Sequence, residues 1–405
     1  MSERPRTGGF VALAATLAIQ VYVSLAASAT AVLAPVIAPE FALSPKLVGP
    51  FIGLVYAGSM VASLVSGSLI ARYGAIRLSQ IGVLVCAIGL ALLPAASWLP
   101  FGTALLVLAP LVIGAGYGPI TPASSQVLAR TAPPSRMALT FSIKQTGVPA
   151  GAALGGAILP ALALGAGWRI ALIAVATVGI AVTLAAQPIR SDLDRSRDRA
   201  RPAVSVRGLF APVAIVLASR TLRELTIMSF FYAAMQVSLT SYLVVFLTDA
   251  LGQSLVAAGL ALTVATMGGV AGRIVWGIVA DSYLRPRTVL GIVGIAAGAC
   301  AFATAAYPAD GSRVALLLLC AVFGSTAIGW NGVQLSELAR HAPRGQAAAI
   351  TGGAGFIGFA GVMLGPPLFG LMASLTGDYR TGFVAMGFAT LAFGAWLLVR
   401  ERSAR

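Results

Sequence analysis

Two cationic side chains interrupt long apolar stretches of this sequence. Lys144 lies in FSIKQTGVPAGAALGG, and Arg273 lies in VAGRIVWG. A charged side chain inside a membrane-spanning helix costs about 3 kcal/mol on insertion scales, which makes such a residue a functional candidate. Arginine can hold a carboxylate through two parallel hydrogen bonds, whereas lysine supplies a point charge. The two residues therefore predict a binding site for an organic anion.

The segments that carry these cations are apolar enough to cross a membrane. Of 405 residues 58% are hydrophobic and 10% are charged, and the mean hydropathy is +0.93. Runs of about 20 apolar residues recur along the chain, and each is long enough to span a bilayer. The first run is too long for a signal-peptide core, so we expect a retained helix. The sequence predicts an all-α membrane protein with twelve transmembrane helices, roughly 10–37, 49–71, 78–97, 101–129, 137–163, 168–187, 224–250, 254–281, 287–307, 312–339, 345–375 and 380–399.

The chain repeats itself at an offset of 210 residues. LARTAP at 128–133 recurs as LARHAP at 338–343, and single residues recur at the same offset, among them Tyr22 and Tyr232. Such a repeat predicts two six-helix halves that run in the same direction, 1–187 and 223–405, joined by a polar cytoplasmic linker, 188–222. In this architecture a substrate site lies between the repeats near the middle of the bilayer.

The basic residues predict the orientation of the helices. With both termini in the cytoplasm, 21 of the 27 lysines and arginines fall in cytoplasmic segments, as the positive-inside rule requires. We therefore expect a multi-pass protein of the inner membrane. The net charge of +15 is spread over loops and does not gather with aromatic residues on one face. Lipid is thus an expected partner and nucleic acid is not.

Two loops carry a recognisable motif. GSLIARYGAIR at 67–77 and GIVADSYLRPR at 277–287 resemble the Gly-x-x-x-Asp-Arg-x-Gly-x-Arg signature of the major facilitator superfamily. The first copy has Ala71 at the acidic position, and the second keeps Asp281 but has Leu284 in place of the central glycine. The resemblance implies a fold of two parallel six-helix halves. It also implies a gating role for the loop residues Gly67, Arg72, Arg77, Gly277, Asp281 and Arg287.

A second likeness concerns the predicted eighth helix. AGRIVWGIVADSYLRPR at 271–287 is similar to the corresponding region of monocarboxylate porters and of the bacterial oxalate exchanger group. In those relatives an arginine four residues before the glycine binds the substrate carboxylate, and Arg273 matches it. Many animal members have an acidic residue one turn earlier, where this chain has Gly269. The resemblance thus implies carboxylate binding, without proton coupling by that acid.

Both cations lie on helix faces lined by small residues. Arg273 continues an alanine and glycine stripe with a spacing of four residues, and Lys144 precedes a stripe of Gly147, Gly151 and Gly155. At 1.5 Å per residue, each lies about 10 to 12 Å above the predicted cytoplasmic end of its helix. The fifth and eighth helices are neighbours in the superfamily, so both cations could flank one cavity. The alternatives are snorkelling of Lys144 and pairing with a structural acid, for which Glu224, Asp281 and Glu337 come nearest.

Other polar groups on the predicted helices are candidates for substrate contact. Tyr22 and Tyr232 could donate to a carboxylate or could hydrogen-bond between helices. Tyr117, Gln236, Trp330 and Asn331 complete the predicted set. Proline residues at 119, 149, 366 and 367 are expected to bend their helices.

The other residue types that could do chemistry argue against catalysis. The sequence has one histidine, no phosphate-binding glycine-rich loop and no metal-ligand spacing among its three cysteines, so we expect no enzyme, cofactor or metal site. We therefore predict a monomeric secondary transporter, a symporter or antiporter, for a small mono- or dicarboxylate. A drug or metabolite exporter is the first alternative, although the acid that exporters of cationic drugs use is missing. A carboxylate-sensing receptor is the second, although no large cytoplasmic domain is present.

Overall fold

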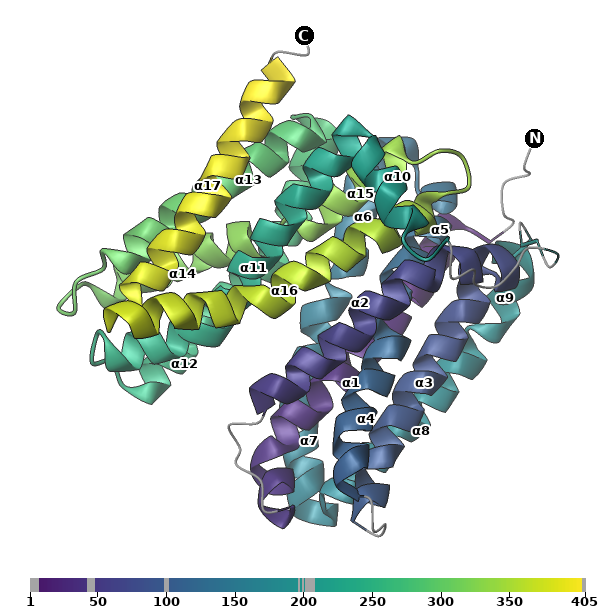
Figure 1. Ribbon diagram of the computed structural model, residues 1–405, viewed down its shortest axis with the longest axis horizontal. Helices are drawn as coiled ribbons and strands as arrows, with labels where there is room; N and C mark the ends of the chain where they lie inside the picture. The colour runs from purple at the N-terminus through teal and green to yellow at the C-terminus, as the bar shows by residue number, and fades with distance from the viewer. Residues whose placement is uncertain are drawn as a thin grey trace. The chain divides into compact units, whose positions relative to one another are not determined.

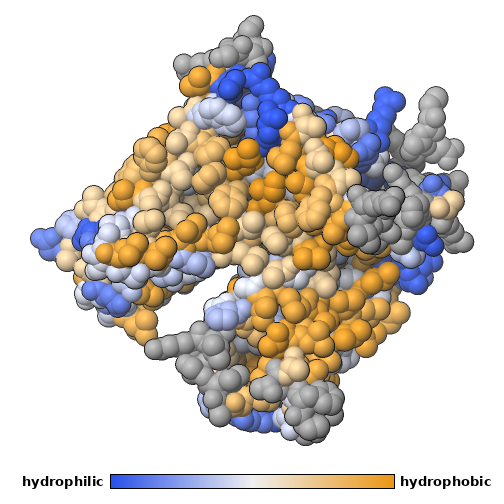
Figure 2. Space-filling model, in the orientation of Figure 1, coloured by the Kyte–Doolittle hydropathy of each residue, from blue (hydrophilic) through white to orange (hydrophobic). Residues whose placement is uncertain are grey.

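The computed structural model describes residues 7–41, 48–97, 102–195, 197–198, 200 and 208–402. Across these ranges the regular secondary structure is helical, and no strand occurs (Figure 1). Twelve spans in the described ranges are long and apolar enough to cross a membrane, which confirms the predicted all-α membrane protein. Figure 2 shows apolar side chains along the flanks of the helices and hydrophilic ones near their ends.

The chain divides into two compact units. Unit 1 comprises Met1–Pro133, Lys144–Leu217 and Ala342–Phe356, and unit 2 comprises Pro134–Ile143, Ala218–His341 and Ile357–Arg405. The boundaries of the two predicted halves and of the linker remain predictions, and part of that linker, including Arg199, lies outside the described residues. The helices up to the predicted linker are α1 (Gly9–Glu40), α2 (Val48–Tyr73), α3 (Ala75–Ala96), α4 (Gly102–Tyr117), α5 (Ile120–Thr131), α6 (Met137–Gln145), α7 (Gly147–Ala166) and α8 (Trp168–Ala185). The remaining helices are α9 (Gln187–Leu193), α10 (Ala211–Ala218), α11 (Arg220–Asp249), α12 (Leu255–Ser282), α13 (Pro286–Ala305), α14 (Arg313–Ala327), α15 (Asn331–His341), α16 (Ala347–Thr376) and α17 (Arg380–Arg402).

Equivalent helices pack in equivalent pairs within the two units. Helix α3 packs on α8 and α2 on α4, while α13 packs on α17 and α12 on α14. Glycines at the 210-residue offset allow close approach: a Cβ at Gly151 would meet the carbonyl of Val21, and one at Gly361 would meet that of Phe230. The glycine stripe of α7 is therefore a packing face against α1.

Three predicted spans are each divided into two helices. The predicted helix 101–129 divides into α4 and α5 at Gly118 and Pro119, and 137–163 divides into α6 and α7 at Thr146. The span 312–339 divides into α14 and α15 at residues 328–330, where no proline occurs. Proline lacks the N–H of the helical ladder, which accounts for the break at Pro119 and favours the one before Pro149. By contrast, Pro366 and Pro367 lie inside the continuous α16.

Candidate functional site

Lys144 is buried in unit 1 at the C-terminal end of α6. Its side chain is 1% exposed, and its ammonium donates to the amide oxygens of Gln20 (2.6 Å) and Gln145 (2.9 Å) and to the hydroxyl of Thr121 (3.4 Å). Gln20 in turn donates to Ser24 at 3.3 Å. These acceptors are neutral oxygens, which orient an ammonium but carry no formal negative charge.

Arg273 is held in a similar way in unit 2. The residue is 1% exposed, its Nε donates to the carbonyl of Ile328 (3.2 Å), and Nη2 donates to Oδ1 of Asn331 (3.1 Å). Ile328 lies at the break between α14 and α15, where the helical ladder is interrupted and its carbonyl can accept from a side chain. The break therefore helps to position the guanidinium.

The repeat relates the contacts of the two cations. Thr121 and Asn331 are 210 residues apart, each lies just after a helix break, and each contacts the buried cation of its own unit. The sequence prediction included Asn331 but missed Thr121 and Gln20. The 210-residue offset was the signal that could have found Thr121. Broken helices whose freed polar groups surround a charged residue are typical of transporter binding sites.

The three acids considered as structural partners make contacts at helix ends. Glu224 pairs with Arg220 (3.2 Å) and with Arg287. Asp281 pairs with Arg340 (3.1 Å). Glu337 lies 3.6 Å from the ring of His341.

Asn331, which contacts Arg273, directly follows a second predicted residue, Trp330. The rings of Tyr232 and Trp330 pack edge to face with centroids 5.6 Å apart, and Trp330 precedes Asn331. Gln236 lies one turn after Tyr232 on α11. Trp330 Nε1 and Gln236 Oε1 are buried and have no hydrogen-bond partner among the described residues. A donor and an acceptor are thus left available for a ligand in the described part of unit 2.

The two tyrosines of the repeat lie between helices of their own units. Tyr232 donates to the carbonyl of Leu290 at 2.9 Å, which is the interhelical alternative for that residue. The ring of Tyr22 lies against Gly179 of α8, where a Cβ would collide with it. Tyr117 is the last residue of α4 and packs against the core of unit 1. Their roles in substrate binding stay predictions.

The loop-motif residues lie at helix ends. In unit 2, Asp281 accepts hydrogen bonds from the first turn of α6, and a Cβ at Gly277 would lie 3.0 Å from Cα of Leu139. In unit 1, a Cβ at Gly67 would lie 2.7 Å from Cα of Ala349, and Arg72 lies over the ring of Tyr73. Both glycines therefore allow a close helix approach.

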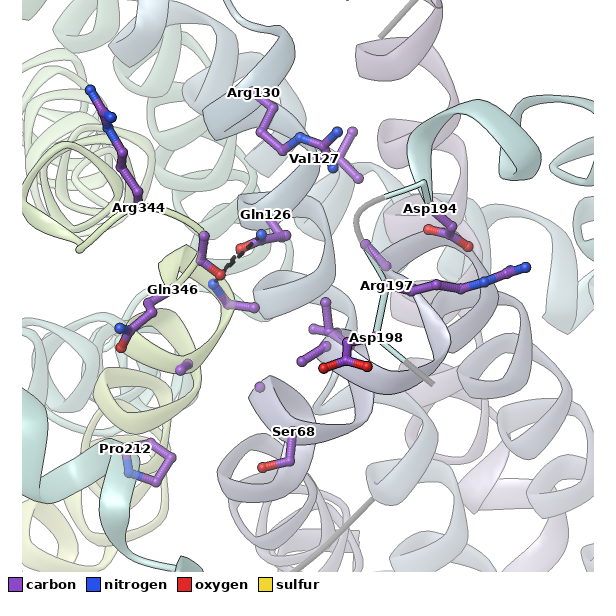
Figure 3. Close-up of a pocket in the computed structure, with 18 of the residues that line it drawn as sticks. Ser68, Gln126, Val127, Arg130, Asp194, Arg197, Asp198, Pro212, Arg344 and Gln346 are labelled. Atoms are coloured by element: carbon purple, nitrogen blue, oxygen red, sulfur yellow. Dashed lines mark hydrogen bonds between the residues drawn. The ribbon is translucent and has the colours of Figure 1, made fainter. Parts of the chain in front are cut away.

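Asp194, which the sequence prediction did not include, caps α3. Its carboxylate accepts from the backbone N–H groups of Ile76 (2.9 Å) and Arg77 (3.0 Å). Burial raises the pKa of the Asp194 carboxyl above its usual range, and these two hydrogen bonds and nearby arginines partly oppose the increase. Asp194 also lines a cavity of about 470 Å³ in unit 1, together with Ser68, Gln126, Arg130 and Asp198 (Figure 3).

In the described ranges no three His, Cys, Asp or Glu side chains gather as metal ligands. The three cysteines, Cys86, Cys300 and Cys320, are buried free thiols. Twelve candidate spans in two units with matching helix pairs are instead typical of a membrane transporter built from two repeats.

Comparison with known proteins identifies the family. The model of the Major Facilitator Superfamily matches residues 16–361, and the chain belongs to this family of membrane transporters. A hexuronate transporter of Bacillus subtilis (strain 168) is 21% identical over 90% of this chain and 89% of its own length. A protein of Oryza sativa subsp. japonica named "Probable anion transporter 6" is 33% identical over 27% of this chain and 26% of its own length. The crystal structure of the E. coli fucose:proton symporter FucP has the same fold, with a TM-score of 0.74, 17% identity and coverage of 97% of this chain and 99% of that one.

Proposed function

We propose that this transporter moves a small organic anion, a mono- or dicarboxylate, across the inner membrane by alternating access. Each unit contributes one buried cation. Arg273 binds a carboxylate through the two-pronged geometry of its guanidinium, and Lys144 supplies a second positive charge. The polar and aromatic candidates Tyr22, Tyr117, Tyr232, Gln236, Trp330 and Asn331 are the further side chains proposed to contact the substrate.

The observation that carries this proposal is the burial of both cations against neutral oxygens at helix breaks. Amide and carbonyl oxygens fix the direction of the N–H groups, and a substrate carboxylate brings the negative charge that these oxygens do not carry. The named relatives support the same class of substrate, because one transports hexuronates and the other is named for anions. A hexuronate carries one carboxylate, as a monocarboxylate substrate would.

Transport by purified protein in proteoliposomes tests the proposal. Uptake of labelled mono- and dicarboxylates, a hexuronate among them, should saturate and should be faster than in empty liposomes. Arg273→Lys should weaken carboxylate binding about tenfold or more, because a point charge cannot reproduce a bidentate contact. Lys144→Ala should weaken a dicarboxylate more than a monocarboxylate, since it removes the second charge.

The matched control is Arg313→Lys, because Arg313 is an exposed arginine at the start of α14. This variant should transport at the wild-type rate. Undiminished affinity in both Arg273→Lys and Lys144→Ala would show that the cations are structural. Carboxylate binding without any flux would identify a receptor instead of a carrier.

A further inference from the structure

A basic cavity lies in unit 2 at the end where α13 begins and α15 and α17 end. Its volume is about 380 Å³, and its wall includes four arginines, Arg285, Arg287, Arg340 and Arg400. Two glutamates, Glu337 and Glu401, also line it, with side chains 8% and 10% exposed. The carboxylates are therefore buried, while Arg285 and Arg400 lie at the exposed mouth.

The four arginines of this cavity differ in how they are paired. Arg340 pairs with Asp281 and Arg287 with Glu224, while Arg285 is 3.8 Å from Glu401 and is 65% exposed. Arg400 makes no ion pair with any described residue, and its guanidinium lies 5.8 Å from the ring centroid of Trp396. The Nε of Arg287 is buried and lacks a hydrogen-bond partner within the described ranges. One exposed guanidinium that makes no ion pair and at least one buried donor thus remain for a ligand.

The position of the cavity relative to the spans indicates the source of that ligand. The helices α13, α15 and α17 all belong to candidate membrane spans, so their ends lie at the level of the lipid headgroups. Tyr283 and Leu284, which come directly before Arg285, are 79% and 41% exposed, and Val399 beside Arg400 is 62% exposed. Apolar and aromatic side chains next to arginines are the arrangement found at a membrane interface.

We propose that this cavity binds the headgroup of an anionic phospholipid. The phosphodiester, with a charge of −1, accepts hydrogen bonds from Arg400 and Arg285 at the mouth, and the exposed apolar residues beside them contact the acyl chains. Basic pockets between transmembrane helices recognise lipid headgroups by this combination of charge and depth. The site uses none of the residues proposed to bind the transported anion.

Lipid titration of the full-length protein in detergent tests this proposal. Phosphatidylglycerol should raise the apparent melting temperature, and phosphatidylcholine with the same acyl chains should not, because ligands of the folded state stabilise it. Arg285→Gln and Arg400→Gln should each weaken binding of phosphatidylglycerol about fivefold, in line with about 1 kcal/mol per arginine near a membrane surface. Glu401→Gln should strengthen the binding of phosphatidylglycerol, because a buried negative charge is removed from the cavity.

The control is Arg313→Gln, which removes an exposed arginine at the start of α14, away from the cavity lining. It should leave the response to phosphatidylglycerol unchanged. Equal loss of the response in this variant and in Arg400→Gln would overturn the site, since it would mean that general surface charge attracts the lipid. Equal stabilisation by inorganic phosphate at the same concentration would overturn the headgroup assignment and make the cavity a free-anion site.

Discussion

The last turn of α12 contains a carboxylate, and the equivalent turn of α2 does not. In unit 2, Asp281 accepts from the backbone N–H groups of Ala138 (3.0 Å) and Leu139 (2.8 Å) in the first turn of α6 and pairs with Arg340. One side chain thus caps a helix and holds an arginine. In unit 1 the equivalent residue is Ala71, and both tasks pass to other groups.

The replacements in unit 1 come from two different segments, and a third segment contacts Ala71 itself. The backbone N–H of Ala348, the counterpart of Ala138, donates to the amide oxygen of Gln126 at 3.1 Å. Arg130, the counterpart of Arg340, donates to the carbonyl of Leu193 at 3.3 Å. The backbone N–H of Asp198 donates to the carbonyl of Ala71 at 2.8 Å. Both units therefore keep a side-chain acceptor at the start of the helix, α6 or α16. The acceptor is a carboxylate in unit 2 and an amide in unit 1, so a carboxylate is not required.

The largest loss of stability is expected from substitution of Asp281. Asp281→Ala leaves two backbone donors of α6 and the guanidinium of Arg340 without their acceptor, and the Asp281 side chain is only 4% exposed. Breaking such a buried pair costs about 3 kcal/mol or more. Thermal unfolding in detergent should show a clear drop in melting temperature. Asp281→Asn should lower the melting temperature less, because the asparagine side chain keeps one acceptor oxygen. Equal melting temperatures for the wild type and Asp281→Ala would refute the capping role.

A smaller effect is expected at the neutral cap of unit 1. Gln126→Ala removes the acceptor for the first turn of α16, and loss of a helix cap typically costs about 1 kcal/mol. The matched control is Ser336→Ala at the equivalent repeat position, since Ser336 donates only within its own helix, to Val333 at 2.8 Å. Chemical denaturation should separate the two variants. If Ser336→Ala were as destabilising as Gln126→Ala, Gln126 would have no special capping role.

Much of the fold could be predicted from the sequence, because apolar length and the 210-residue repeat are strong signals. The breaks were harder to predict. Gly118 and Pro119 marked one, whereas the break at 328–330 has no proline to mark it. Arg273 and Lys144 stood out because charge is rare in apolar helices. Gln20 was missed because a lone amide in an apolar helix gives no direction, and its contact with Lys144 depends on how helices pack.

The smallest effect concerns a carboxylate restored to unit 1. Ala71→Asp gives the last turn of α2 the acid that Asp281 provides in α12, close to the start of α16 and to Arg130. In the wild-type background Gln126 already caps α16 and Asp198 lies in the same cavity, so the gain should be under about 0.5 kcal/mol. In the Gln126→Ala background the new carboxylate should take over the vacant cap and recover about half of the lost stability. The measurement is a double-mutant cycle of unfolding free energies, in which a favourable coupling is expected. Strict additivity of the two substitutions would mean that the ends of α2 and α12 are not equivalent in this respect, and that the cap of unit 1 depends on the amide of Gln126 alone.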